Sequence, residues 1–163
     1  MNASLSSLLI QQERKDPEST YLCGQFGQVS YAETLLLVRQ LGQLLTLSKR
    51  IARTRSVGIS TETPEYVAYT VWAAIFADIS IVFLPHCRNP DVMRRAMKEA
   101  SVEVLLTDEP ALLQEPWCLD LKELLRRALS GGGRLGEDTE VGDEERRYGD
   151  SRIRSGGRRM VAA

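Results

Sequence analysis

Hydrophobic and polar residues alternate with helix-like and strand-like spacings along the first 129 residues. Near the start, leucines that share one helical face (Leu5, Leu8, Leu9) predict an amphipathic helix over about residues 3–15, which the following Asp-Pro pair ends. A short run over residues 20–24, a turn containing Gly27 and a return from Val29 then predict a β-hairpin.

A capping box predicts the start of the next helix. The Ser30 hydroxyl can accept a hydrogen bond from the backbone N–H of Glu33, and the Glu33 side chain can reach back to Ser30. The helix is expected to run to about Ser48, and one face carries its apolar residues: Leu35, Val38, Leu41, Leu44 and Leu45. Basic residues lie near its C-terminal end, where the helix dipole favours cations: Lys49, Arg50 and Arg53.

Strands and helices alternate after this point. Strands are expected at residues 56–60, 79–84 and 102–107, and the second, with no polar alternation after Ser80, has the pattern of a strand buried on both faces. Between and after them, helices are expected over three ranges: 64–77, 90–100 and 120–129. Thr63 is expected to cap the first of these, with Pro64 at its first position. This order predicts an α/β fold with parallel βαβ units and right-handed crossovers.

Composition changes sharply near Ser130. Eight of the twelve glycines lie after this residue, among many charged and few aliphatic side chains. Such a segment cannot bury enough apolar surface to offset the entropy of ordering its backbone. The sequence therefore predicts one α/β region over residues 1–129 and a disordered, low-complexity tail over residues 130–163.

The overall composition indicates which partners and which cellular compartment to expect. Hydrophobic residues make up 43% of the 163, and the formal net charge is −1, so neither nucleic acid nor a membrane is an expected partner. The longest apolar stretch is interrupted by Asp78 and Ser80, and the N-terminus has no basic region typical of a signal peptide. Three widely spaced cysteines fit a reducing compartment. A cytoplasmic protein is expected.

Seven short motifs occur in an order that resembles the AMP-dependent synthetase/ligase family, the adenylate-forming enzymes that include acyl-CoA synthetases. They are Asp16-Pro17-Glu18, Phe26-Gly27-Gln28-Val29-Ser30-Tyr31-Ala32-Glu33, Val57-Gly58-Ile59-Ser60, Thr63-Pro64-Glu65-Tyr66-Val67, Ala73-Ala74-Ile75-Phe76-Ala77-Asp78, Val82-Phe83-Leu84-Pro85 and Val104-Leu105-Leu106-Thr107-Asp108. The match covers about residues 4–129. The resemblance implies the N-terminal part of the adenylate-forming large domain, and Asp78 stands where the family usually has Gly.

The family's chemistry lies outside the matched segment. The resemblance implies ATP, Mg and CoA as cofactors of the whole enzyme, held by a Thr/Ser/Gly-rich phosphate loop, a ribose-binding Asp and a catalytic Lys. The first Gly-rich stretch after the match, Ser130-Gly131-Gly132-Gly133-Arg134, lacks the threonines and the lysine and is expected to be a flexible linker. We therefore assign this chain no catalytic, cofactor-binding or metal-binding residue, and expect no cofactor for it.

Other residues of types that could carry chemistry are expected to have structural roles. His86 beside Cys87 could suggest a metal or nucleophile pair, but a loop histidine with a backbone partner is expected. Cys23 is expected to serve as a small apolar residue. The aromatic residues Tyr69, Trp72 and Phe76 have helical spacing and are expected in the core. A solvated basic helix face is expected for Arg94, Arg95 and Lys98. Helix capping is the expected role of Glu62 and Glu65.

Three hypotheses about function follow. The first is an N-terminal segment of an AMP-forming acid–CoA ligase, similar to o-succinylbenzoate–CoA ligases, truncated and inactive alone. The second is a non-catalytic interaction or regulatory module that pairs with a separate chain, either the missing remainder of the ligase or a paralogue. The third is an independent doubly wound ligand-binding domain, which ATP-dependent thermal stabilisation would favour. Whether the chain is an enzyme stays open at this stage.

Overall fold

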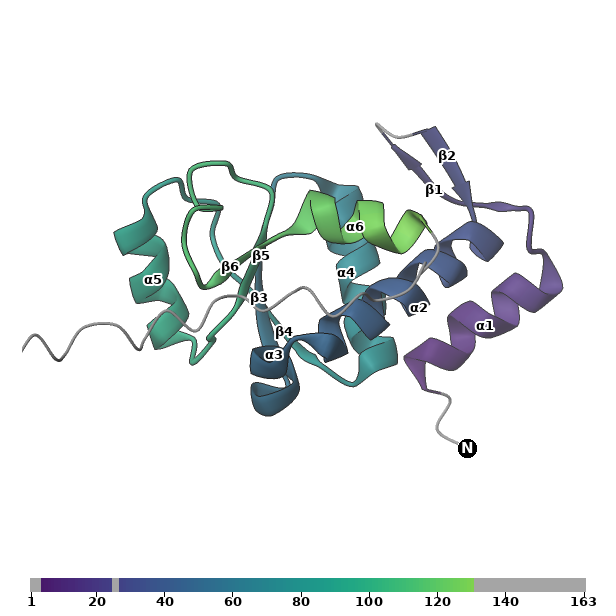
Figure 1. The fold of residues 1–163 in the computed structure, drawn as a ribbon. Coiled ribbons are helices and arrows are strands. Elements are labelled where there is room, and N and C mark those ends of the chain that lie inside the picture. Colours follow the sequence, from purple (N-terminus) through teal and green to yellow (C-terminus); the bar gives the residue numbers. More distant parts are fainter. Residues whose placement is uncertain (1–3, 25–26, 131–163) are drawn as a thin grey trace, which may run out of the picture.

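The computed structural model describes residues 4–24 and 27–130, which fold into six helices and six strands within those ranges (Figure 1). The helices are α1 (Leu5–Lys15), α2 (Tyr31–Leu47), α3 (Lys49–Thr54), α4 (Pro64–Ala77), α5 (Pro90–Glu99) and α6 (Leu121–Leu129). The strands are β1 (Thr20–Gly24), β2 (Gly27–Ser30), β3 (Ser56–Ser60), β4 (Ser80–Phe83), β5 (Leu105–Thr107) and β6 (Cys118–Asp120).

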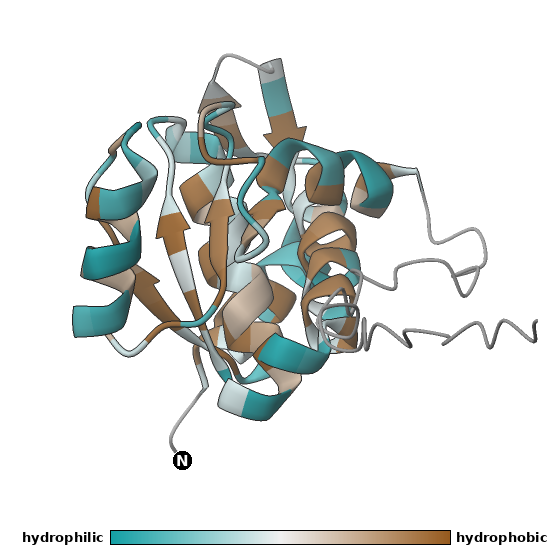
Figure 2. Ribbon diagram, turned by 60° about the vertical axis from the view of Figure 1, so that its left-hand side comes forward, coloured by the Kyte–Doolittle hydropathy of each residue, from teal (hydrophilic) through white to brown (hydrophobic). Residues whose placement is uncertain are grey.

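A four-stranded parallel sheet forms the centre of the fold, with the strand order β4-β3-β5-β6. Its two faces are covered separately because successive strand residues point to opposite sides. Leu106 packs in the core formed with α2, α4 and α6, whereas Leu105 packs in a second core formed with α5. The expected α/β fold with parallel βαβ units is confirmed. Figure 2 shows the sheet between helices, with hydrophobic residues along the strands.

The β1–β2 hairpin is antiparallel and lies against α2, with side-chain contacts to α4. Trp72 on α4 donates a hydrogen bond from its indole N–H to the Tyr21 hydroxyl, and Tyr21 stacks edge-on against Tyr31. Gly24 lies directly on the buried side chain of Glu65, where a Cβ atom would come within 1.7 Å of the Glu65 carboxylate. A side chain at position 24 would therefore require the Glu65 side chain to move.

The predicted capping box opens α2. The Ser30 hydroxyl accepts from the backbone N–H of Glu33 at 3.3 Å, and the Glu33 carboxylate accepts from the backbone N–H of Ser30 at 2.9 Å. These hydrogen bonds satisfy two donors that the first helical turn leaves unpaired. The hairpin therefore leads directly into α2, the helix at the centre of the larger core.

The predicted helix to about Ser48 is confirmed as α2, and a second, short helix, α3, follows it directly. Ser48 has an extended backbone (ψ 113°), so α2 ends at Leu47 and the basic residues expected at its end lie in or beside α3. There they make specific contacts: Arg50 donates to the Pro116 carbonyl at 2.9 Å, and Arg53 pairs with Glu103. The expected position of the basic residues, just after the C-terminal end of α2, is confirmed, and Arg50 and Arg53 in addition hold α3 to the segments before and after β5.

The expectation that the strand at residues 79–84 is buried on both faces was wrong. Among the described strands, β4 pairs only with β3 and forms an edge of the sheet, and Phe83 is 63% exposed. The chain passes from β4 through α5 to the other side of β3, so β3 and β5 are the inner strands. β6 was not predicted, because three residues are too few to show a period. The predicted disorder concerns residues that, apart from Ser130, lie outside the described part of the chain.

Candidate functional site

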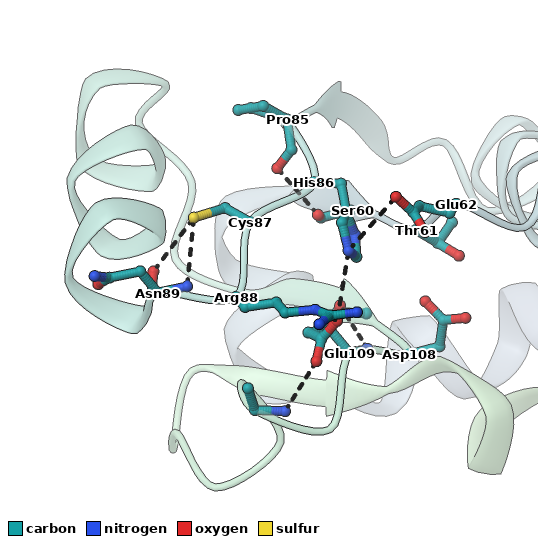
Figure 3. Close-up of polar contacts among 12 residues, drawn as sticks. Ser60, Thr61, Glu62, Pro85, His86, Cys87, Arg88, Asn89, Asp108 and Glu109 are labelled. Atoms are coloured by element: carbon teal, nitrogen blue, oxygen red, sulfur yellow. Dashed lines mark hydrogen bonds and ion pairs between the residues drawn. The ribbon is translucent and has the colours of Figure 1, made fainter.

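Polar side chains gather at the carboxyl ends of β3, β4 and β5 (Figure 3). The chain leaves β3 for β4 on one side and later returns to β5 on the other, which makes the β3–β5 boundary a topological switch point. Ligands of open parallel sheets usually bind outside the strands at such a point. This edge is therefore the first place to look for a site.

Glu109 is the centre of this polar cluster. Its carboxylate lies 3.4 Å from the His86 Nε2 and 3.2 Å from the Arg88 Nε, and it accepts from the backbone N–H of Ala111 at 3.3 Å. The Glu109 side chain is only 11% exposed, whereas Arg88 is 78% exposed. The His86 ring, the Arg88 guanidinium and the Ala111 N–H thus surround a largely buried carboxylate, and the arrangement fixes the loop after β4 against the loop after β5.

Hydrogen bonds from hydroxyl groups hold the same loops. The Ser60 hydroxyl donates to the Pro85 carbonyl at 3.1 Å, and the Thr107 hydroxyl accepts from the backbone N–H of Glu109 at 3.2 Å. Thr63 occupies the predicted N-cap position of α4, but its hydroxyl faces the Asp108 carboxylate at 3.4 Å in place of a capping bond. These polar groups therefore use their hydrogen bonds within the protein.

His86 does not form the metal or nucleophile pair with Cys87 that adjacency could suggest. Its Nε2 faces the carboxylates of Glu109 and, at 3.8 Å, Glu62, in place of the expected backbone partner. The Cys87 thiol accepts from the backbone N–H of Asn89 at 3.4 Å. Within residues 4–24 and 27–130, no group of three or more His, Cys, Asp or Glu side chains is placed to hold a metal ion.

The other suggestive residues have mixed outcomes. The core role expected for the aromatics of α4 is confirmed, since Tyr69 is 5% exposed and Trp72 and Phe76 pack against the same core. The basic face of α5 is exposed, as expected. Cys23 was expected to be a small apolar residue, but it is exposed, because it lies on a hairpin strand whose outer end has no cover.

An apolar groove is the second candidate site. It has a volume of about 500 Å³ and lies between α2, α4 and α6, with β2 at one end. Its lining is mainly apolar and aromatic and includes Leu36, Leu37, Tyr66, Tyr69, Leu125 and Leu129. Burial raises the pKa of both tyrosine hydroxyls above their usual range, with the nearby carboxylates of Asp108 and Glu65 adding to the effect. The groove is shaped for apolar contact and offers little polar chemistry.

Comparison with solved structures assigns this architecture to the fold of adenylate-forming enzymes. The N-terminal subdomain of Klebsiella oxytoca NpsA, in complex with 3-hydroxyanthranilyl-AMSN, is similar with a TM-score of 0.60 and 12% identity. Bacillus subtilis o-succinylbenzoate coenzyme A synthetase (MenE), in complex with AMP, is similar with a TM-score of 0.59 and 20% identity. The family resemblance expected from the sequence is thus confirmed at the level of the fold.

The match covers most of this chain but only part of each solved structure. It covers 77% of this chain and 31% of the NpsA chain, and 72% of this chain and 32% of the MenE chain. The chain therefore spans about a third of the length of these solved structures, and its fold is that of the N-terminal part of the adenylate-forming large domain. No protein-family model and no curated protein matches the sequence.

Among the described residues, no helix combines the length and the apolar character that a bilayer crossing requires.

Proposed function

We propose that this chain is the N-terminal segment of an AMP-forming acid–CoA ligase, an enzyme that activates a carboxylic acid with ATP before transfer to CoA. The single observation that carries the proposal is the similarity in fold over about three quarters of the chain, in the region that contains the seven sequence motifs. ATP, Mg and CoA are the proposed cofactors of the whole enzyme. An aryl acid of the o-succinylbenzoate type is its proposed substrate class.

Residues 1–163 are proposed to be inactive by themselves. Acid activation needs hydrogen-bond donors and cations directed at the triphosphate of ATP. The polar cluster at the carboxyl ends of β3, β4 and β5, here called the switch-point cluster, instead presents the carboxylates of Glu62, Asp108 and Glu109. The basic side chains of this cluster, His86 and Arg88, face Glu109. Like charges within a few ångströms repel, so this edge of the sheet disfavours a polyanion. Residues 1–129 are proposed as the partial AMP-binding-enzyme region, and residues 130–163 as an appended tail, in a cytoplasmic protein.

Thermal unfolding with and without MgATP tests this proposal. A ligand that binds only the native state raises its stability by RT ln(1 + [L]/Kd), so the proposal predicts an unchanged melting temperature for the 163-residue chain in millimolar MgATP. The control is the same concentration of MgCl2. A rise of several degrees that needs ATP would favour the hypothesis of an independent ligand-binding domain.

The coding DNA tests the parentage of the segment. If an acid–CoA ligase gene gave rise to this chain through a change of reading frame, another frame after about codon 130 should encode a stretch like Thr-Ser-Gly-Thr-Thr-Gly. Two other frames without such a stretch would remove the frameshift version of the proposal.

A non-catalytic module that pairs with a separate chain is the alternative function. The observation in its favour is the open edge at β4, which is uncharged and carries the 63% exposed Phe83. Such an edge can accept a strand from a partner. Purification of a tagged copy from its own cells distinguishes the two functions. Recovery of the chain alone as a monodisperse species would count against a partner.

A further inference from the structure

The walls of the apolar groove carry exposed leucines. Leu36 on α2 is 61% exposed and Leu129 at the end of α6 is 71% exposed, and both line the groove. Leu5 on α1 and Phe83 on β4 are similarly exposed, but neither of them lines it. A small molecule that filled the groove would leave the outer sides of its two leucines in water, whereas a partner protein would cover them. An apolar surface of this kind is typical of a protein-binding site.

The length of the groove matches that of a short helix. The lining residues of α6 extend from Lys122 to Leu129, about 10 Å along the helix axis, and Figure 1 shows α6 beside α2, which forms the facing wall. Two turns of a helix have the same length, and they present apolar side chains at positions i, i+3 or i+4, and i+7 along one face. Tyr66 and Tyr69 of α4 are buried and line the base of the groove, where such side chains would pack.

The charges along the groove indicate an acidic partner. Lys122 and Arg126 line it from α6, and among the described residues Lys122 has no ion pair. Arg126 is held by Glu123 through two hydrogen bonds of 2.7 Å, but both side chains are largely exposed, so the pair contributes little and can exchange partners. The Glu33 carboxylate in the lining is already hydrogen-bonded within the capping box of α2. The remaining positive charge complements carboxylates on a partner.

We propose that the groove between α2, α4 and α6 binds an acidic amphipathic helix of a partner protein. The apolar face of that helix packs between Leu36 and Leu129, and its carboxylates lie over Lys122 and Arg126. The proposal goes beyond the ligase parentage, because this contact needs neither ATP nor an acid substrate. The groove also shares no residue with the switch-point cluster, so either proposal can fail without the other.

Binding of a synthetic helix to the 163-residue chain tests the site. The probe is a labelled peptide of about 18 residues, long enough to form a helix, with leucines along one face and alanine and glutamate elsewhere. The control peptide has lysine in place of each glutamate. Fluorescence anisotropy should show at least tenfold tighter binding of the acidic peptide, and about 0.5 M salt should reduce the difference, because salt screens exposed charges. Equal binding of the two peptides, or binding of neither, would overturn the proposal.

Two matched pairs of variants locate the contact. Leu36→Ser should weaken binding of the acidic peptide at least tenfold, whereas Leu47→Ser, at a leucine 53% exposed on α2 outside the groove, should leave it unchanged. Lys122→Glu should weaken the acidic peptide and strengthen the lysine peptide, whereas Lys98→Glu makes the same charge change at an exposed position of α5 and should do neither. Circular dichroism checks that the variants are folded.

The same variants separate this partner from a second copy of the chain. Sedimentation of the free protein should show no self-association that depends on Leu36. A dimer that Leu36→Ser abolishes would make a second copy the occupant of the groove and overturn the proposal. Tight binding of the acidic peptide that survives both Leu36→Ser and Lys122→Glu would overturn it as well, because the peptide would then bind elsewhere.

Discussion

Two non-glycine residues with positive φ set the starts of neighbouring strands. Arg55 (φ 51°) ends α3 and Asp78 (φ 54°) ends α4, and their side chains pair at 2.8 Å. The Arg55 carbonyl also accepts from the backbone N–H of Ser80 at 2.8 Å. The pair therefore ties the residues that precede β3 and β4. Asp78 stands where the family that the sequence resembles usually has Gly, and Asp tolerates this backbone region better than most residues, so it suits the positive φ at position 78.

Cysteine reactivity gives a prediction at the same scale. Burial, with a smaller contribution from the Glu115 carboxylate, raises the pKa of the Cys118 thiol to about 12, while Cys23 is exposed. Because the thiolate is the reactive form, a thiol reagent at about pH 8 should label Cys23 at least tenfold faster than Cys118 in the native protein. Mass spectrometry of timed samples measures both rates. Comparable native rates would contradict the burial of Cys118, whereas denaturant should make all three cysteines react quickly.

At the scale of secondary structure, the sequence predicted the helices whose starts depend on interactions between neighbouring residues. The capping box fixes the start of α2 because its hydrogen bonds lie within four residues, and Asn89 caps α5 in the same local way. The edge position of β4 could not be predicted, since the run Ile81-Val82-Phe83 is equally apolar in a central or an edge strand. Only the order of strands, which depends on the whole chain, distinguishes the two positions.

The crossing of α2 and α4 depends on Gly42. A Cβ atom there would lie 2.9 Å from the backbone oxygen of Ala73, an atom that cannot rotate away. The gain of about 1 kcal/mol in helix propensity for Gly42→Ala is therefore smaller than the cost of overpacking, and a net loss of about 1–2 kcal/mol in the free energy of unfolding is expected.

Urea denaturation measures this loss. Gln43→Ala is the matched control, because Gln43 is exposed on the same helix and should change stability by less than about 0.5 kcal/mol. A Gly42→Ala protein more stable than the parent would show that the two helices do not approach so closely.

The capping box predicts a pH dependence. Hydrogen bonds from the Ser30 backbone N–H and hydroxyl lower the pKa of Glu33 below its ordinary value of 4.5. A lowered folded-state pKa stabilises the protein fully above the ordinary value, and this contribution is lost as the pH falls through the folded-state pKa. Glu33→Gln keeps a capping side chain but cannot titrate.

Denaturation midpoints of the parent and the Glu33→Gln variant from pH 7 to about pH 3 isolate the contribution. The parent should lose stability relative to the variant on acidification. The account of the cap would be wrong if the parent gained stability relative to the variant in that range.

At the scale of the whole molecule, the switch-point cluster could not be assembled from the sequence. His86 and Glu109 are separated by 23 residues, and they meet because β4 and β5 flank β3 in a parallel sheet. Each residue follows the end of a predicted strand, and that shared position was the available signal. It could not identify the partners, since it does not specify which strands are neighbours or where the loop side chains turn.

The open edge at β4 predicts poor solubility. An uncharged edge strand with an exposed Phe83 offers unpaired backbone groups to another molecule. Phe83→Lys should reduce light scattering at 37 °C severalfold with little change in melting temperature, because a charge on an edge opposes strand pairing. The control is Leu8→Lys, which places the same charge on an exposed position of α1, away from the sheet. Equal improvement by both variants would assign the effect to net charge. A sharp, reversible melt of the parent well above room temperature would contradict the prediction.

Acid-dependent ATP–pyrophosphate exchange by the purified 163-residue chain tests the central claim most directly. The claim is that this chain has the opening architecture of an adenylate-forming enzyme but presents carboxylates, not phosphate-binding groups, at its switch point. The account predicts no exchange above background with o-succinylbenzoate, benzoate or acetate, under conditions in which an intact acid–CoA ligase is active. Exchange that requires both the acid and MgATP, and that follows the 163-residue protein through purification, would contradict it.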